Sequence, residues 1–308
     1  MPELSVILPA RNAETTVAAA VSSTLRALPR DAELVVLDDG STDATAQEVI
    51  RGAGGRRGPD PRLRLLQTPP SGGLTQALSQ LIAATDSRTV ARMDADDLCM
   101  PWRFRISLPH LRRDCDLVFT QVVNLVGRRP DPEPPVGITP EAFPLHLLLT
   151  NPVSHPTALI RREVLDRVGG YRRVPAEDYD LWLRCAAGGA RLRRIGAWGL
   201  IYRIHPHQIT ASDEWRSASW RDPLQAEAFA DLSERLVDRR LPRLVALARV
   251  AEPERSEAVE AFRAAVLPAI SGLGGFQERF LRYRLDRRCD WVRSGPGHHA
   301  SQPRGSAT

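Results

Sequence analysis

Lysine is absent from this chain of 308 residues, so all 42 of its basic side chains are arginine. A GC-rich coding sequence explains this bias more simply than any function does. The formal net charge of +5 is small and spread along the chain, and no DNA- or RNA-binding motif accompanies it. The composition therefore argues against a nucleic-acid-binding surface, and no nucleic-acid partner is expected.

Cysteine is scarce, and the four cysteines lie far apart at Cys99, Cys115, Cys185 and Cys289. No two of them have CxxC spacing, so the sequence predicts neither a zinc site nor a disulfide framework, and a reducing compartment fits. The first residues lack the basic segment and apolar core of a signal peptide. No run approaches the ~18 apolar residues of a membrane-spanning helix. We therefore expect a cytoplasmic protein.

The first half of the chain alternates short apolar runs with helical patterns. Asn12 is expected to cap the first helix, because its side chain can accept a hydrogen bond from the first turn. This alternation predicts βαβ units and a mainly parallel sheet, which binds ligands beyond the carboxyl ends of its strands. The expected strands are residues 4–9, 33–39, 62–67 and 88–93, and the expected helices are residues 13–28, a segment ending near residue 51, and residues 71–84.

The second half is less regular, and it becomes helical after residue 213. We expect a strand at residues 116–126, a Pro-rich loop at 128–140 and a strand or strand pair at 192–203. The expected helices are residues 141–149, 162–168, 179–187, 221–240, 242–250, 254–271 and 275–292. We therefore divide the chain into an α/β domain (1–212), a helical C-terminal extension (213–293) and a disordered tail (294–308).

The stretch ARMDADDLCMP gathers three carboxylates at the end of an expected strand, on Asp94, Asp96 and Asp97. Two unit charges ~4 Å apart repel by about 1 kcal/mol in water and by several times more near a protein interior. A positive group is therefore expected beside them. Asp38 and Asp39 end another expected strand, which places both acidic clusters on the ligand-binding rim of the sheet.

Two acidic motifs are excluded by single positions. An EF-hand loop needs an acidic or amide residue where Leu98 stands and glycine where Cys99 stands. An aspartyl phosphatase needs its nucleophile where Leu37 stands. What remains is an Asp-x-Asp pair on a strand-to-loop turn, which can hold Mg²⁺ or Mn²⁺ while leaving positions open for phosphate oxygens. A solvated acidic turn without a metal is the alternative.

Seven segments, in order, resemble the family 2 glycosyltransferases, and together they span about two thirds of the chain. The resemblance implies the GT-A fold, a Rossmann-like α/β fold in which helices flank a mixed, mainly parallel sheet. The segments are SVILPARNAE (5–14), VVLDDGSTDAT (35–45), GGLTQAL (72–78), ARMDADDLCMPWR (91–103), NPVSHPTALIRREVLDRVGGYR (151–172), AEDYDLWLR (176–184) and YRIHPHQIT (202–210).

The resemblance implies a nucleotide-diphosphate sugar donor of the UDP or dTDP type and a divalent metal, Mn²⁺ or Mg²⁺. Asp39 would accept the imide N–H of uracil or thymine, and Asp94 would contact both ribose and metal. The donor-binding residues implied in this way are Pro9, Ala10, Arg11, Asp39, Arg92, Asp94 and Ala95. The implied metal ligands are Asp94, Asp96 and His205.

The resemblance also assigns the catalytic base to Asp178. This carboxylate would remove the proton from an acceptor hydroxyl in a single displacement that inverts the anomeric carbon. Glu177 and His155 would line the acceptor pocket. The alternatives are that Glu177 and Asp178 only cap their helix, and that His155 is a plain loop residue. A glycan, a lipid-linked sugar or a small molecule would each fit as the acceptor.

Several neighbours of these residues are expected to have structural roles. Asp38 and Asp97 would hold turns, and Asp180 would support its helix. Leu181 and Trp182 would lie on the buried face of the same helix.

Two positions depart from the family pattern, because Arg11 replaces an aromatic residue and Ser79 replaces an asparagine. Two other classes of protein stay open. A sugar nucleotidyltransferase would need a Gly-rich, basic phosphate loop after the first strand, which residues 9–12 do not provide. A non-catalytic nucleotide-sugar-binding protein would not need Asp178.

Arginine and aromatic residues alternate in the last expected helix, between residues 276 and 293. Such a helix either packs on the protein with its arginines exposed or lies on anionic lipid, where each arginine contributes ~1 kcal/mol. The second case would make the protein membrane-peripheral. The segment after residue 213 is otherwise expected to close over the acceptor or to join two subunits as a homodimer.

Overall fold

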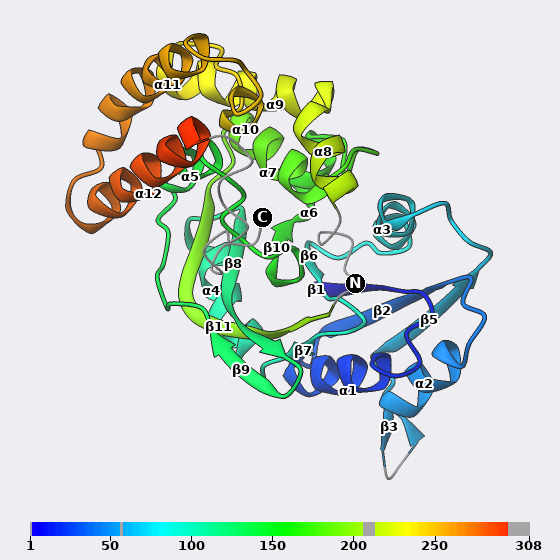
Figure 1. Ribbon diagram of the computed structural model, residues 1–308. Coiled ribbons are helices and arrows are strands. Elements are labelled where there is room, and N and C mark those ends of the chain that lie inside the picture. The colour runs from blue at the N-terminus through cyan, green and yellow to red at the C-terminus, as the bar shows by residue number, and fades with distance from the viewer. Residues whose placement is uncertain (1, 56–57, 206–212, 295–308) are drawn as a thin grey trace. The chain divides into compact units, whose positions relative to one another are not determined.

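The computed structural model describes residues 2–55, 58–205 and 213–294, and the chain forms two compact units (Figure 1). The first unit comprises residues 1–137, 153–173 and 194–206, and the second comprises residues 138–152, 174–193 and 207–308. The predicted disordered tail lies outside the described residues apart from Ser294, which ends the last helix. That residues 1–212 form a domain of their own stays a prediction.

A mixed nine-stranded sheet, in the order β5-β2-β1-β6-β10-β8-β11-β7 with β9 beside β8, organises the first unit. The pairs β1–β2, β1–β6 and β2–β5 are parallel, whereas β10 is antiparallel to β6 and β8. The strands are β1 (Leu4–Ala10), β2 (Ala32–Asp39), β5 (Leu63–Thr68), β6 (Thr89–Arg92), β7 (Leu98–Cys99), β8 (Leu117–Val126), β9 (Arg129–Pro132), β10 (Leu159–Arg161) and β11 (Leu192–Ile204). A separate hairpin pairs β3 (Gly54–Gly55) with β4 (Gly58–Pro59). The mixed α/β architecture predicted from the sequence is confirmed.

Helices cover both faces of the parallel strands. The chain runs outward from β1 to β2 and β5, and then returns across β1 to β6. Because such crossovers are right-handed, α1 and α2 lie on one face and α3 lies on the other (Figure 1). The helices of this unit are α1 (Val17–Ala27), α2 (Thr45–Gly52), α3 (Leu74–Ala83), α4 (Arg103–Arg113), η1 (His155–Thr157) and α6 (Arg162–Arg167).

The predicted cap at Asn12 is wrong. Helix α1 begins at Val17, and Asn12 lies in the preceding loop with a positive φ of 48°. Asparagine tolerates this left-handed conformation better than most residues. Its side-chain oxygen accepts from the backbone N–H of Thr42 at 2.9 Å, so Asn12 joins two loops instead of starting a helix.

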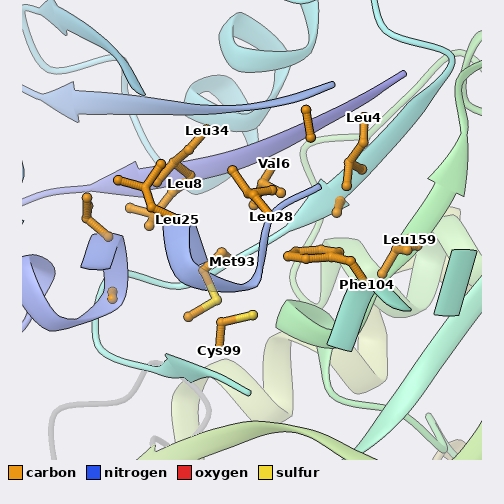
Figure 2. Packing of buried hydrophobic residues seen from close by; sticks show 14 of the residues in the cluster. Leu4, Val6, Leu8, Leu25, Leu28, Leu34, Met93, Cys99, Phe104 and Leu159 are labelled. Carbon is orange, nitrogen blue, oxygen red and sulfur yellow. The ribbon is translucent and has the colours of Figure 1, made fainter. Parts of the chain in front are cut away.

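The core of the first unit forms between β1, β2 and β6 on one side and α1 and α4 on the other (Figure 2). Nearly every residue of β1 and β2 is buried, as expected for parallel strands covered on both faces. All four cysteines of the chain are buried. Residues labelled in the core view are Leu4, Val6, Leu8, Leu25, Leu28, Leu34, Met93, Cys99, Phe104 and Leu159.

The second unit is helical, as predicted for the residues after 213, and it also contains α5 and α7 from the middle of the chain. Helix α12 packs through the apolar stripe Leu281, Leu285, Cys289 and Val292, whereas Phe276 and Tyr283 are exposed. Within the described residues, no helix combines the length and apolar character needed to cross a membrane. The helices are α5 (Phe143–Leu147), α7 (Glu177–Ala187), α8 (Asp213–Arg221), α9 (Pro223–Val237), α10 (Leu244–Leu247), α11 (Glu254–Ser271) and α12 (Gly275–Ser294).

We predict that Leu8→Ala lowers the free energy of unfolding by about 2–5 kcal/mol, because it leaves a cavity in the packed centre of the sheet. Leu8 is fully buried, whereas Ile50 on α2 is 44% exposed. The control Ile50→Ala removes a side chain of the same size and should cost less than about 1 kcal/mol. Urea unfolding followed by circular dichroism measures both. Equal losses in the two variants would contradict this description of the core.

Candidate functional site

The loops after β1 and β2 are tied together at the carboxyl ends of these strands. Asp38 accepts from the backbone N–H of Ser41 at 3.1 Å, which confirms its predicted role in the turn. The backbone N–H of Ala13 donates to Thr45 Oγ1 at 2.7 Å. Of the predicted donor-binding residues around the end of β1, Ala10 is buried and Pro9 is half-buried, whereas Arg11, which follows the strand, is exposed.

Asp39, the last residue of β2, is buried and positions the loop before α3. Its two oxygens accept from the backbone N–H of Ser71 at 2.6 Å and from the Ser71 hydroxyl at 2.9 Å. Gly40, at a φ of 68°, is required next to it, because a Cβ there would lie 2.5 Å from Pro70 Cδ. Each carboxylate oxygen of Asp39 keeps a second lone pair, so it can still accept from a ligand.

The acidic stretch follows β6, the other parallel neighbour of β1, and its three carboxylates converge. One oxygen from each of Asp94, Asp96 and Asp97 lies within 4.8 Å of the other two. Asp94 and Asp96 are partly exposed, and so is Ala95 between them, whereas Asp97 is buried. Hard oxygen ligands gathered at this range suit Mg²⁺ or Mn²⁺. The residues present therefore fit the predicted divalent metal.

Asp97 anchors a distant strand as well as adding to this charge. One of its oxygens accepts from the backbone N–H of Arg203 in β11 at 2.9 Å. The other oxygen is buried and has no hydrogen-bond partner among the described residues. Burial raises the pKa of Asp97 well above its usual value, and the charges of Asp94 and Asp96 raise it further.

Two buried arginines lie next to the acidic stretch. Arg92 forms an ion pair with Asp94 and donates to the carbonyl of Met93. Arg103, in the first turn of α4, is fully buried and donates to the carbonyl of Arg92 at 2.8 Å. Burial lowers the pKa of Arg103, and the nearby Cys99, Asp97 and Asp94 oppose that shift. The predicted contact of Arg92 with the donor stays a prediction.

Arg103 was not identified from the sequence. It stands at the end of the quoted segment ARMDADDLCMPWR. The signal in the sequence would have been a basic residue placed so soon after the aspartates.

The predicted metal ligand His205 lies beside Asp96. Its Nε2 atom is 2.9 Å from an oxygen of Asp96. The imidazole is therefore within reach of a cation held by Asp96, and it otherwise bonds to that carboxylate directly. His155, predicted to line the acceptor pocket, bonds through Nε2 to the hydroxyl of Tyr171 at 2.7 Å in the same unit.

The predicted base Asp178 belongs to the second unit, in the first turn of α7 with Glu177. Its carboxylate accepts from the side-chain amide of Asn151 at 2.8 Å. The residue before this turn, Ala176, has a positive φ of 54°, which is unusual for a residue other than glycine. The partial positive charge at the helix N-terminus favours negative charge at Asp178. Sequence reasoning missed Asn151, which begins the quoted segment NPVSHPTALIRREVLDRVGGYR.

The structural residues of α7 lie as predicted. Asp180 is fully buried and accepts from Arg184 Nε at 2.8 Å. Leu181 and Trp182 are fully buried. Helix α7 is thus fixed to its unit on one side, while Glu177 and Asp178 remain half-buried.

Comparison with known sequences gives one family. Residues 5–169 match the model described as Glycosyl transferase family 2. The succinoglycan biosynthesis protein ExoU of Rhizobium meliloti is 32% identical over 225 residues, which cover 68% of this chain and 64% of that protein. The UDP-Glc:alpha-D-GlcNAc-diphosphoundecaprenol beta-1,3-glucosyltransferase WfgD of Escherichia coli is 26% identical over 187 residues, 58% of this chain and 68% of that protein.

Comparison with solved structures agrees on the fold. S. aureus TarS in complex with UDP-GlcNAc superposes with a TM-score of 0.60 at 17% identity, covering 94% of this chain and 89% of that chain. The mannosyltransferase PcManGT of Pyrobaculum calidifontis, in complex with GDP-Man and Mn²⁺, gives a TM-score of 0.54 at 20% identity, covering 95% and 82%. The predicted GT-A fold is confirmed.

We predict that Arg103→Met lowers the free energy of unfolding by about 3 kcal/mol, because it removes a buried cation that balances the aspartates. Methionine keeps most of the apolar stem. The control Arg105→Met changes an exposed arginine of the same helix and should shift stability by about 0.5 kcal/mol at most. Urea unfolding of both variants, each compared with the unaltered chain, measures the difference. Equal stability of the two variants would show that Arg103 does not balance the acidic stretch.

Proposed function

This chain belongs to glycosyl transferase family 2, and we propose that it transfers a sugar from a nucleotide-diphosphate donor to an acceptor hydroxyl. The observation that carries the proposal is the convergence of three carboxylates at the end of β6, next to β1 in the sheet. On the other side of β1, β2 ends in Asp39. This is the point where the strand order reverses, at which open α/β sheets bind nucleotides.

The donor is proposed to be a UDP- or dTDP-sugar. Asp39 would accept the imide N–H of the base through its free lone pairs, with Pro9, Ala10 and Arg11 around the ring. Arg92, Asp94 and Ala95 would contact the ribose and the sugar. The solved structures of similar fold contain UDP-GlcNAc in one case and GDP-Man with Mn²⁺ in another, which supports a nucleotide-sugar donor of some kind.

Asp94, Asp96 and His205 are proposed to hold Mn²⁺ or Mg²⁺. When bound, such an ion neutralises charge that develops on a departing diphosphate. Asp96 and Asp94 are exposed enough to reach a ligand. Asp97 contributes by fixing β11, and thereby His205, to the acidic stretch through Arg203.

Asp178 is proposed as the base that takes the proton from the acceptor hydroxyl. The oxygen so activated attacks the anomeric carbon in line with the departing nucleotide diphosphate, and the configuration inverts. Asn151 orients the carboxylate through its 2.8 Å hydrogen bond. A positioned base of this kind contributes about 10²–10⁴-fold to the rate. Glu177 and His155 are proposed acceptor contacts.

The acceptor is proposed to be a glycan or a lipid-linked sugar. The name of the E. coli relative specifies a diphosphoundecaprenol acceptor, which is the main support for the lipid-linked class. Membrane contact through α12 and homodimer formation also stay proposals. In favour of the first, Phe276 and Tyr283 are exposed on α12 beside the exposed Arg279 and Arg287.

The direct test is a thermal-shift screen of nucleotide sugars with Mn²⁺, followed by product analysis with glycan and lipid-linked acceptors. A glycosyltransferase releases a nucleoside diphosphate and forms a glycoside. A sugar nucleotidyltransferase would instead form or consume inorganic diphosphate, and a binding protein would show a thermal shift without turnover. Either of the last two results would overturn the proposal.

We predict that Asp96→Ala abolishes the metal-dependent part of donor binding while the protein stays folded, because it removes a ligand of the ion. Isothermal titration with UDP, in Mn²⁺ and in EDTA, measures this part. Asp86→Ala is the matched control, since Asp86 is an exposed carboxylate that precedes β6. Unchanged affinity of Asp96→Ala in Mn²⁺ would rule out the metal assignment.

We predict that Asp178→Asn keeps donor affinity but lowers the transfer rate by about 10²-fold or more, because the amide retains the size of the side chain and loses its basicity. Rates of sugar transfer and donor affinity are measured side by side. The comparison variant Asp166→Asn makes the same change at an exposed carboxylate of α6 and should keep most of the rate. If Asp178→Asn retains more than about a tenth of the rate, another group is the base.

A further inference from the structure

A pocket of about 60 Å³ lies within the second unit, lined by helices α7 to α10 and α12. Three arginines line it, Arg216, Arg243 and Arg288, together with Trp215 and Trp220. None of the described residues that line the pocket is acidic. The volume suits a small group with a few water molecules better than a whole sugar nucleotide.

Arg243 is buried, and its charge meets mainly neutral partners. Its guanidinium donates to the carbonyl of Ser219 at 2.7 Å and to the side-chain oxygen of Gln225 at 2.9 Å. It also lies over the ring of Tyr179, 5.3 Å from the centroid. Burial lowers the pKa of Arg243, and among nearby carboxylates Asp222 acts in the opposite direction.

Arg288 is more unusual than Arg243, because it makes no hydrogen bond or ion pair with any described residue. Its Nε atom is shielded from solvent and has no partner. The guanidinium lies 4.5 Å from the ring centroid of Trp291. Burial lowers the pKa of Arg288 to about 10, and repulsion by Arg243 contributes. The side chain is therefore still cationic at neutral pH, although nothing described neutralises it.

Burying an unpaired charge is costly, and such charges in proteins are usually paired or bind a ligand. An anion in this pocket would supply the missing partner. The planar guanidinium of arginine matches phosphate oxygens in two-point hydrogen bonds. The charge of two or three arginines is balanced better by a multiply charged phosphate group than by a singly charged carboxylate ligand. The tryptophans and apolar residues beside them suit the organic part of an ester.

The pocket also adjoins the proposed base. Asn151 lines the pocket and donates to the carboxylate of Asp178. We propose that this pocket binds a phosphate or diphosphate ester group of the acceptor, an inference that rests on the proposed transferase function for the word acceptor. The anion would hold the acceptor while its hydroxyl meets Asp178.

The test uses the full chain in EDTA, with inorganic diphosphate as the probe and no nucleotide. Arg288→Met should weaken diphosphate binding about tenfold or more, the loss expected for charge-assisted hydrogen bonds. Arg287→Met changes the adjacent, exposed arginine by the same charge and should stay within about twofold of the unaltered chain. Equal losses in both variants would mean unspecific attraction and would overturn the site.

A second readout separates binding from a structural role. Without anion, Arg288→Met should melt at or above the temperature of the unaltered chain, because it removes an unpaired charge. Diphosphate should raise the melting temperature of the unaltered chain and not that of the variant. If Arg288→Met melts lower and binds diphosphate unchanged, Arg288 is structural and the proposal is wrong.

Two further probes identify the class of ester. Farnesyl diphosphate that binds at least tenfold tighter than inorganic diphosphate assigns a lipid-linked ester, and equal affinity assigns a soluble one. Glucuronate that binds tighter than either would overturn the phosphate assignment. Donor binding in Mn²⁺ is measured separately. If no nucleotide sugar binds but diphosphate binding still depends on Arg288, the transferase function is refuted and the anion site is retained.

Discussion

Three carboxylates at the end of β6 need positive charge beside them, and much of the first unit is arranged around that requirement. Arg92 and Arg103 supply it from the buried side. Arg92 forms an ion pair with Asp94, and Arg103 donates a hydrogen bond to the carbonyl of Arg92. On the more exposed side, Asp96 bonds to His205. The acidic stretch is therefore partly balanced by the fold and still open to a small cation.

The order of the strands explains why this stretch lies where a nucleotide would bind. The chain builds β1, β2 and β5 in one direction and then returns to place β6 on the other side of β1. The carboxyl ends of β2 and β6 therefore flank that of β1, with Asp39 on one side and Asp94 on the other. Asp97 then fixes β11 to the same rim through the backbone of Arg203.

Most of the fold could be predicted from the sequence, because buried parallel strands and amphipathic helices differ in their apolar periodicity. The Asp-x-Asp pair could be placed for the same reason, since it directly follows such a strand. Asn12 misled the prediction, because asparagine suits both a helix cap and a left-handed loop position. Only the long-range bond to Thr42 decides between the two.

The partners that were missed depend on contacts between distant segments. Asn151 and Asp178 are far apart in the sequence and meet only in the folded second unit. The position of Arg288 could be recognised from the sequence, because it stands three residues after Leu285 and seven after Leu281, on the buried stripe of α12. A basic residue on an apolar stripe could have been singled out, but its surroundings could not.

We propose that the acidic stretch of the first unit holds one divalent ion together with a nucleotide diphosphate. Uptake of Mn²⁺ tests it most directly, because free Mn²⁺ has a strong electron paramagnetic resonance signal that weakens on binding. We predict that the protein with UDP takes up one Mn²⁺ per chain, more tightly than UDP alone does. A free-ion signal that the protein leaves unchanged, with or without UDP, would contradict it.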